Sequence, residues 1–251
     1  MSWSRAHPPR LRAGGLLHLW EQAGDLSPLE RAVAMATVEL DAAGSHAEES
    51  LRDLPLGRTH ALLLDLHERL WGDDLVATAA CPKCGERVEF TMPVATVRDV
   101  KPGQPDALLL HGGYVVSWRC PTPADLLVVA TAVDPGARLA DRCLSVTNDG
   151  RPVDPATLPD DARAAVDDLL ADADPLAEIV VSITCPDCGD EFATDLDPGR
   201  FVWAELDAHA VRILHGVDVL ARAYGWTEAE VLALGDRRRA AYLSLVLDGV
   251  P

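Results

Sequence analysis

The chain has 251 residues, is 48% hydrophobic and 25% charged, and carries a formal net charge of −18, which together describe a globular protein of one large or two modest domains. No apolar run reaches the length of a bilayer span, so we expect a soluble protein without a membrane partner. Between Pro121 and Arg200 there are 17 Asp and Glu residues against 5 Arg and no Lys. This negative charge disfavours nucleic-acid binding, which needs a cationic surface. It favours either solubility or docking on a basic protein. The alternative is that it reflects a generally acidic proteome.

The first part of the chain is predicted to be helical. Residues 1–15 are expected to form a flexible arm and residues 16–74 a helical region. A short apolar helix is expected over 16–24, and a second from Ser27, where Ser27 and Glu30 form a capping box, to about residue 43. After a polar loop, leucines at helical spacing predict a third helix, which ends at Gly72: Leu62, Leu63, Leu66 and Leu70.

Two pentapeptides of the form Cys-Pro-x-Cys-Gly begin about 100 residues apart, at Cys81 and at Cys185. Strand-like sequence flanks each one, so each is predicted to lie at the tip of a β-hairpin, where the two thiolates point to one place. The glycine that follows supplies the permissive backbone of a tight turn. We predict that 75–92 and 177–197 are the two halves of one zinc-ribbon-like module.

The four cysteines of these motifs form a ligand set that suits tetrahedral zinc: Cys81, Cys84, Cys185 and Cys188. A thioredoxin-type redox motif would place one Cys-x-x-Cys at a helix start, and disulfides would require secretion, whereas no signal peptide is expected here. We therefore predict one structural Zn²⁺ per chain in a reducing compartment. Cys120 and Cys143 have no partner at metal spacing and are predicted to be small buried hydrophobic residues.

Residues 93–176 are predicted to form an acidic mixed α/β insertion. It is expected to contain a loop-rich stretch over 93–106 and a hairpin at 108–119 that turns at Gly112-Gly113. Helices are expected at 122–133, with a capped start at Thr122 and Asp125, at 138–144 and at 160–171. Residues 198–251 are predicted to be helical, with a long helix that ends before Gly225, a capping box at Thr227 and Glu230, and a final helix. The fold class is therefore α+β, with helical arms around the cysteine module.

No catalytic motif is present: the chain has no glycine-rich phosphate loop, no His-Glu-x-x-His and no Gly-x-Ser-x-Gly. His60, His67, His209 and His215 are interpreted as surface or packing residues, and Asp160, Asp161, Asp167 and Asp168 as a solvated helix face. Trp203, Trp226 and Tyr242 are either interface anchors or core residues. Arg237–Arg239 are expected to pair with carboxylates or to favour a helix end. We predict a non-enzyme that binds no small-molecule substrate.

Several segments spread along the chain resemble the baseplate-hub assembly (chaperone) family of T-even-type contractile phages, in the version found in bacterial phage-tail-like and contractile injection clusters. The segments that carry the resemblance are Leu19-Trp20-Glu21, 28–32, 54–58, 66–72, 121–126, Arg142-Cys143, 174–178, 201–205, 220–234 and 237–243. The resemblance implies hub components or assembly factors, and no catalytic residue.

The expected function is therefore that of a zinc-stabilised baseplate component or assembly factor. It would be assembled in the cytoplasm of the producing cell and would contact baseplate hub, spike or other tail proteins. The alternative is a zinc-ribbon regulator that binds nucleic acid, which the acidic charge disfavours. A third possibility is an enzyme whose site is assembled from dispersed residues.

Overall fold

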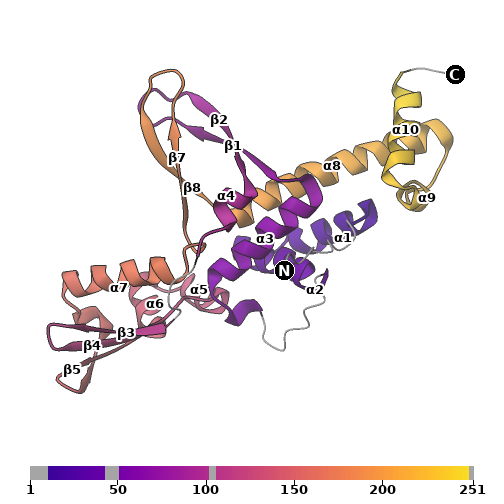
Figure 1. The fold of residues 1–251 in the computed structure, drawn as a ribbon. Helices are drawn as coiled ribbons and strands as arrows, with labels where there is room; N and C mark the ends of the chain where they lie inside the picture. Colours follow the sequence, from indigo (N-terminus) through magenta and orange to yellow (C-terminus); the bar gives the residue numbers. More distant parts are fainter. Residues whose placement is uncertain (1–10, 43–50, 102–105, 249–251) are drawn as a thin grey trace, which may run out of the picture. The chain divides into compact units, whose positions relative to one another are not determined.

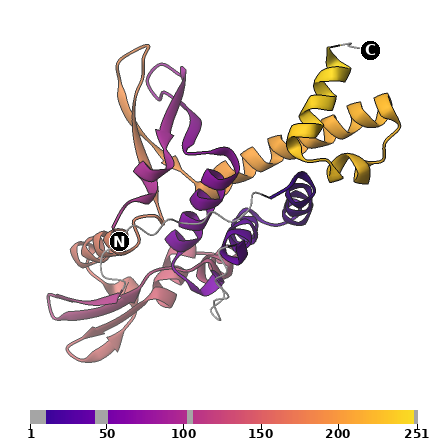
Figure 2. The same ribbon diagram turned by 45° about the vertical axis from the view of Figure 1, so that its right-hand side comes forward.

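The computed structural model describes residues 11–42, 51–101 and 106–248, and it divides the chain into two compact units. A terminal unit combines residues 1–35 with 199–251, and a central unit contains residues 36–198. The described part of the chain begins and ends with helices, and small antiparallel sheets come between these helices in the sequence, so the predicted α+β class is confirmed (Figures 1 and 2). No helix within the described ranges is long and apolar enough to cross a membrane.

The terminal unit is built from helices. Ser27 and Glu30 form the predicted capping box, and the Trp20 indole Nε1 donates a hydrogen bond to Asp207 Oδ1 at 2.8 Å. The Arg31 guanidinium lies 4.1 Å from the centre of the Trp203 ring, which ties the second helix to the eighth. The helices are α1 (Ala13–Gly24), α2 (Pro28–Ala42, shared with the central unit), α8 (Pro198–Tyr224), α9 (Glu228–Ala233) and α10 (Asp236–Leu247).

The flexible arm predicted for residues 1–15 is partly wrong, because α1 begins at Ala13 and buries that residue. Residues 1–10 lie outside the described ranges. The long helix α8 has the predicted end, since Gly225 takes a φ of 69° and its N–H donates to Ala221 O at 2.8 Å. Glycine fits this left-handed position because it has no Cβ.

The central unit contains three antiparallel sheets within its described residues, in the orders β1-β2, β3-β4-β5-β6 and β7-β8. The helix α3 ends at Gly72 as predicted, and this glycine takes a φ of 111°. The strands are β1 (Asp74–Ala80), β2 (Arg87–Pro93), β3 (Asp106–His111), β4 (Tyr114–Arg119), β5 (Leu144–Asn148), β6 (Arg151–Val153), β7 (Ile179–Thr184) and β8 (Glu191–Leu196). The helices are η1 (Leu51–Asp53), α3 (Leu56–Trp71), α4 (Val94–Arg98), α5 (Pro123–Val129), α6 (Pro135–Cys143), η2 (Pro155–Thr157) and α7 (Asp160–Ala173).

The predicted insertion folds around its own small core. The helix α7 packs on the four-stranded sheet through Val116, Val146, Leu158, Ala162 and Val166. Three details of the prediction were wrong: α4 interrupts the stretch expected to be loop, α5 ends at Val129 rather than near 133, and the short strands β5 and β6 were not foreseen. Strand β6 has three residues and contains a proline, so neither alternation nor β-propensity marks it in the sequence.

The start of α3 is a buried polar junction. The Gly57 N–H donates to Asp174 Oδ2 at 2.9 Å, and His60 Nδ1 lies 2.7 Å from Leu176 O. The Leu56 N–H donates to Pro121 O at 3.1 Å. A carboxylate from a segment 117 positions away thus caps this helix, whose own N-cap residue, Pro55, provides no side-chain acceptor.

Gly57→Ala is expected to destabilise the central unit by about 3 kcal/mol, the sum of overpacking and a weakened bond to a carboxylate. A Cβ on Gly57 would lie 1.9 Å from Asp174 Oδ1 and 3.0 Å from Leu176 Cβ, so the 174–176 segment has to move. Urea unfolding measures the effect. The control is Gly14→Ala in α1, where a Cβ meets nothing within 4 Å and higher helix propensity makes the change neutral or slightly stabilising. Equal stabilities for the two variants would contradict the close approach.

Candidate metal centre

Two hairpins carry the cysteine motifs, as the sequence predicted. Strand β1 pairs with β2 from Asp74↔Pro93 to Ala80↔Arg87, and β7 pairs with β8 from Ile179↔Leu196 to Thr184↔Glu191. The two turns are closed by matching bonds, since each glycine N–H donates to the carbonyl of the first cysteine, at 2.9 Å in one turn and 3.0 Å in the other. Gly85 and Gly189 take φ values of 77° and 70°, so both turns need the permissive backbone.

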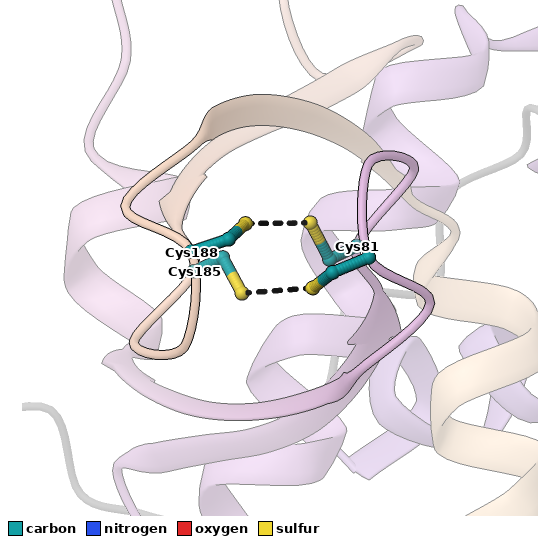
Figure 3. A group of neighbouring side chains, drawn as sticks. Cys81, Cys185 and Cys188 are labelled. Carbon is teal, nitrogen blue, oxygen red and sulfur yellow. Dashed lines mark hydrogen bonds between the residues drawn. The ribbon is translucent and has the colours of Figure 1, made fainter.

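The four cysteines of the two turns meet at one point. Cys81 Sγ lies 3.7 Å from Cys188 Sγ, and Cys84 Sγ lies 3.7 Å from Cys185 Sγ, so each pair joins one hairpin to the other (Figure 3). All four sulfur atoms lie within 4.8 Å of one another. Bonds of about 2.3 Å to a tetrahedral zinc would separate the sulfurs by about 3.8 Å, whereas a disulfide needs about 2.05 Å. The spacing fits a shared metal ion.

The electrostatics of the cluster also favour a cation. Backbone N–H groups, that of Cys84 first, lower the pKa of Cys81 to about 7. The Glu86 N–H favours the thiolate of Cys84 too, but burial and the surrounding thiols outweigh it and raise the pKa of Cys84 to about 12. The pKa of Cys188 is raised as well: an N–H of Asp190 favours its thiolate, and burial and neighbouring thiols oppose it. A divalent cation bound by the four sulfurs would offset the effect of burial and of the neighbouring thiols, and would hold every cysteine in its thiolate form.

Within the described residues, few contacts other than those of the cysteine cluster join the two hairpins. Their shared core consists of four buried residues, Cys81, Val88, Ile183 and Cys185, with Ala79, Phe90, Val181 and Phe192 partly buried around them. The Lys83 ammonium lies 3.2 Å from Asp190 Oδ1 and so links the two turns at the surface, where an exposed pair contributes little. A two-stranded hairpin is marginal in water, and a metal ion bound by the four cysteines would stabilise this pair.

Four protein ligands would close the coordination sphere of a zinc ion. Such a site has no open position for water or substrate, so it stabilises structure instead of activating a reactant. The residues present therefore fit structural zinc and do not suit zinc catalysis.

The cysteine cluster contains none of the other residues singled out in the sequence. Cys120 and Cys143 are buried, as predicted, and burial raises the pKa of Cys120 to about 11. The predicted solvated acids of α7 are exposed. His67 is buried against the Trp71 ring, consistent with a packing role. Trp226 and Tyr242 pack with Tyr224 in one aromatic cluster, at centroid distances of 4.7 to 5.7 Å.

A charged network around Asp125 was not foreseen. Asp125 is 1% exposed and accepts hydrogen bonds from Arg119 Nη1 at 2.5 Å, from Arg142 Nε at 2.7 Å and from the Thr122 N–H at 3.0 Å. The sequence indicated the cap formed by Thr122 and Asp125, which is confirmed as a capping box. Nothing in local spacing relates Asp125 to an arginine 17 positions later.

Comparison with known proteins gives one family. The model of a family described as T4 bacteriophage base plate protein matches residues 30–197. This range contains both cysteine hairpins and the whole segment between them. No curated protein and no solved structure matches the chain.

Proposed function

Because this chain belongs to the T4 bacteriophage base plate protein family, we propose that it is a non-enzymatic component or assembly factor of the baseplate of a contractile phage-tail-like injection particle. The family match over residues 30–197 is the observation that carries the proposal. The protein acts through contacts with hub, spike or other tail proteins. It is assembled in the cytoplasm of the producing cell.

The cysteine cluster supports a structural role within this proposal. One Zn²⁺ per chain is held by Cys81, Cys84, Cys185 and Cys188, and it joins two hairpins that are separated by the acidic insertion. A closed thiolate site performs no hydrolysis, in agreement with a non-enzyme. The net charge of −18 disfavours the nucleic-acid alternative, since a phosphate-binding surface needs an excess of Lys and Arg.

Deletion of the gene is expected to yield tubes or sheaths without complete baseplates, visible by electron microscopy of producing cells. Complementation with the wild-type gene restores particles, whereas a gene carrying Cys84→Ser and Cys188→Ser does not. The control is a gene carrying Gly14→Ala, which should complement fully because a Cβ at this position meets nothing within 4 Å. Normal particles in the deletion strain would refute the proposal. Affinity purification of the wild-type protein should recover tail proteins from the same cluster.

A further inference from the structure

A cavity of about 800 Å³ lies between the two cysteine hairpins. Its walls are β2 and β7, and α4 and the Pro175-Leu176 segment close its base. The lining is mainly apolar and includes Phe90, Val97, Val181 and Ile183. We call this cavity the inter-hairpin slot.

The slot wall formed by β7 is an edge strand. Within the described part of the chain β7 pairs with β8 alone. The Cys185 N–H donates to Asp190 O at 2.8 Å, which makes this pair a hydrogen-bonded one. Since hydrogen-bonded and non-hydrogen-bonded pairs alternate in an antiparallel ladder, the backbone N–H and C=O groups of Val180, Ser182 and Thr184 point away from β8. All three residues line the slot.

The opposite wall has the same property. Among the described strands β2 pairs with β1 alone, and the Cys81 N–H donates to Glu86 O at 2.8 Å. The same alternation directs the backbone groups of Glu89 and Thr91 away from β1, and both residues line the slot. Two strand edges with free hydrogen-bonding capacity therefore border one apolar cavity.

The slot is held at both ends. At the tips of the hairpins the four cysteines lie within 4.8 Å of one another. At the base, Arg98 at the end of α4 donates to Asp65 Oδ1 of α3 at 2.7 Å and also to Glu68. The Gly57–Asp174 bond anchors the segment that leads into β7. Binding at such a site loses little entropy on the receptor side, because the walls are already positioned.

We propose that the inter-hairpin slot binds an extended, apolar segment of a partner protein that carries Lys or Arg at its flanks. The segment adds a strand to the edges of β2 and β7 and so joins the two ribbons into one sheet. This inference rests on the proposed function in baseplate assembly and names the class of partner segment. An exposed edge is an aggregation hazard unless it is covered, and Val180 on this edge is 56% exposed.

Charge determines the choice of occupant. The charged residues that line the slot are Glu89 and Glu178, both acidic. The chain as a whole carries −18, so an acidic segment or a second copy of the chain meets repulsion, and a basic segment is attracted. The apolar walls select alternate apolar side chains, as one face of a strand presents them.

A peptide library tests the slot directly. Full-length, zinc-loaded protein is used to select from nonapeptides with five randomised central positions and either two Lys or two Glu at each end. The selected peptides are expected to have Lys flanks and alternate β-branched or aromatic residues. Ser182→Pro is expected to weaken binding of a selected peptide by about tenfold or more, since proline removes the outward N–H without breaking a bond to β8.

The control is Ala193→Pro, because Ala193 is the β8 partner of Ser182 in the ladder and its outward N–H faces the opposite edge. Both positions are exposed, so the cost to folding is matched, and binding should stay within about twofold of wild type. Glu89→Lys should remove the preference for Lys flanks, whereas Glu191→Lys on β8, which does not line the slot, should keep it.

The inference is overturned by an absence of selected peptides, by acidic flanks, by equal losses in the two proline variants, or by peptides that bind outside β2 and β7. Self-association that Ser182→Pro abolishes would identify a second copy as the occupant and equally overturn it. The selection needs no baseplate. A slot that fails here leaves the deletion phenotype intact, while normal particles in the deletion strain refute the baseplate role itself.

Discussion

Cys84→Ser combined with Cys188→Ser is expected to reduce the zinc content from about one ion per chain to none and to unfold both hairpins. The cluster loses one thiolate from each turn, and two remaining ligands cannot complete a tetrahedral site. Structural zinc contributes about 10–16 kcal/mol of apparent binding free energy in zinc-finger peptides, whereas the hairpins share a core of four buried residues. Elemental analysis gives the metal content, and amide hydrogen exchange over 74–93 and 179–196 reports the unfolding.

The matched control is Cys143→Ser, which alters a buried cysteine outside the cluster. It is expected to lower stability slightly, through a buried hydroxyl, and to leave zinc content unchanged. Exchange protection in the four-stranded sheet should survive the double substitution, because that sheet has its own core. If the purified wild-type protein contains no metal and its stability does not change when a chelator is added, the cluster is not a zinc site.

Asp125→Asn is expected to destabilise the central unit by about 3 kcal/mol at pH 7, because it leaves Arg119 and Arg142 without their shared carboxylate. Both arginines retain some contact with water, so the loss lies at the low end of the range for buried pairs. The hydrogen bond from Arg119 is the main reason that the pKa of Asp125 lies well below its usual range. The control is Asp168→Asn on the exposed face of α7, which should change little.

The pH dependence follows from the direction of that shift. A carboxylate with a lowered pKa in the folded state stabilises the protein above its unfolded pKa of about 3.9, and this contribution disappears as the pH falls toward the folded value. The difference in unfolding free energy between wild type and Asp125→Asn should therefore be constant near neutrality and shrink below about pH 4. A difference that does not change with pH would show that the charge of Asp125 contributes nothing.

Local sequence patterns predicted most helices and strands, because the residues that start and end these elements lie within them or next to them in the chain. The capping boxes at Ser27, Thr122 and Thr227, and the left-handed glycines Gly72 and Gly225, depend on residues within one turn of the chain. The errors have equally clear causes. Strand β6 is too short for a period, and α5 ends early at a position that no breaker residue marks.

Segments that carried the family resemblance turn out to be neighbours in the fold. Residues 54–58 contact 174–176 through Gly57 and Asp174, and 121–126 contact Arg142-Cys143 through Asp125. Each such contact joins parts of the chain whose separation, 17 to 117 positions, carries no periodic signal. The resemblance therefore identified segments that contact one another, but only the tertiary structure shows which residues of these segments are partners.

The sequence by itself determined the pair of cysteine hairpins, because the tight Cys-Pro-x-Cys-Gly turn depends mainly on its own residues, the glycine above all. The tertiary structure decided that the two turns face each other with sulfurs 3.7 Å apart, and that β2 and β7 border an apolar slot. These features depend on how a segment of about 100 residues leaves and returns. That path is set by long-range packing, whose free energy comes from contacts between distant residues and leaves no local pattern.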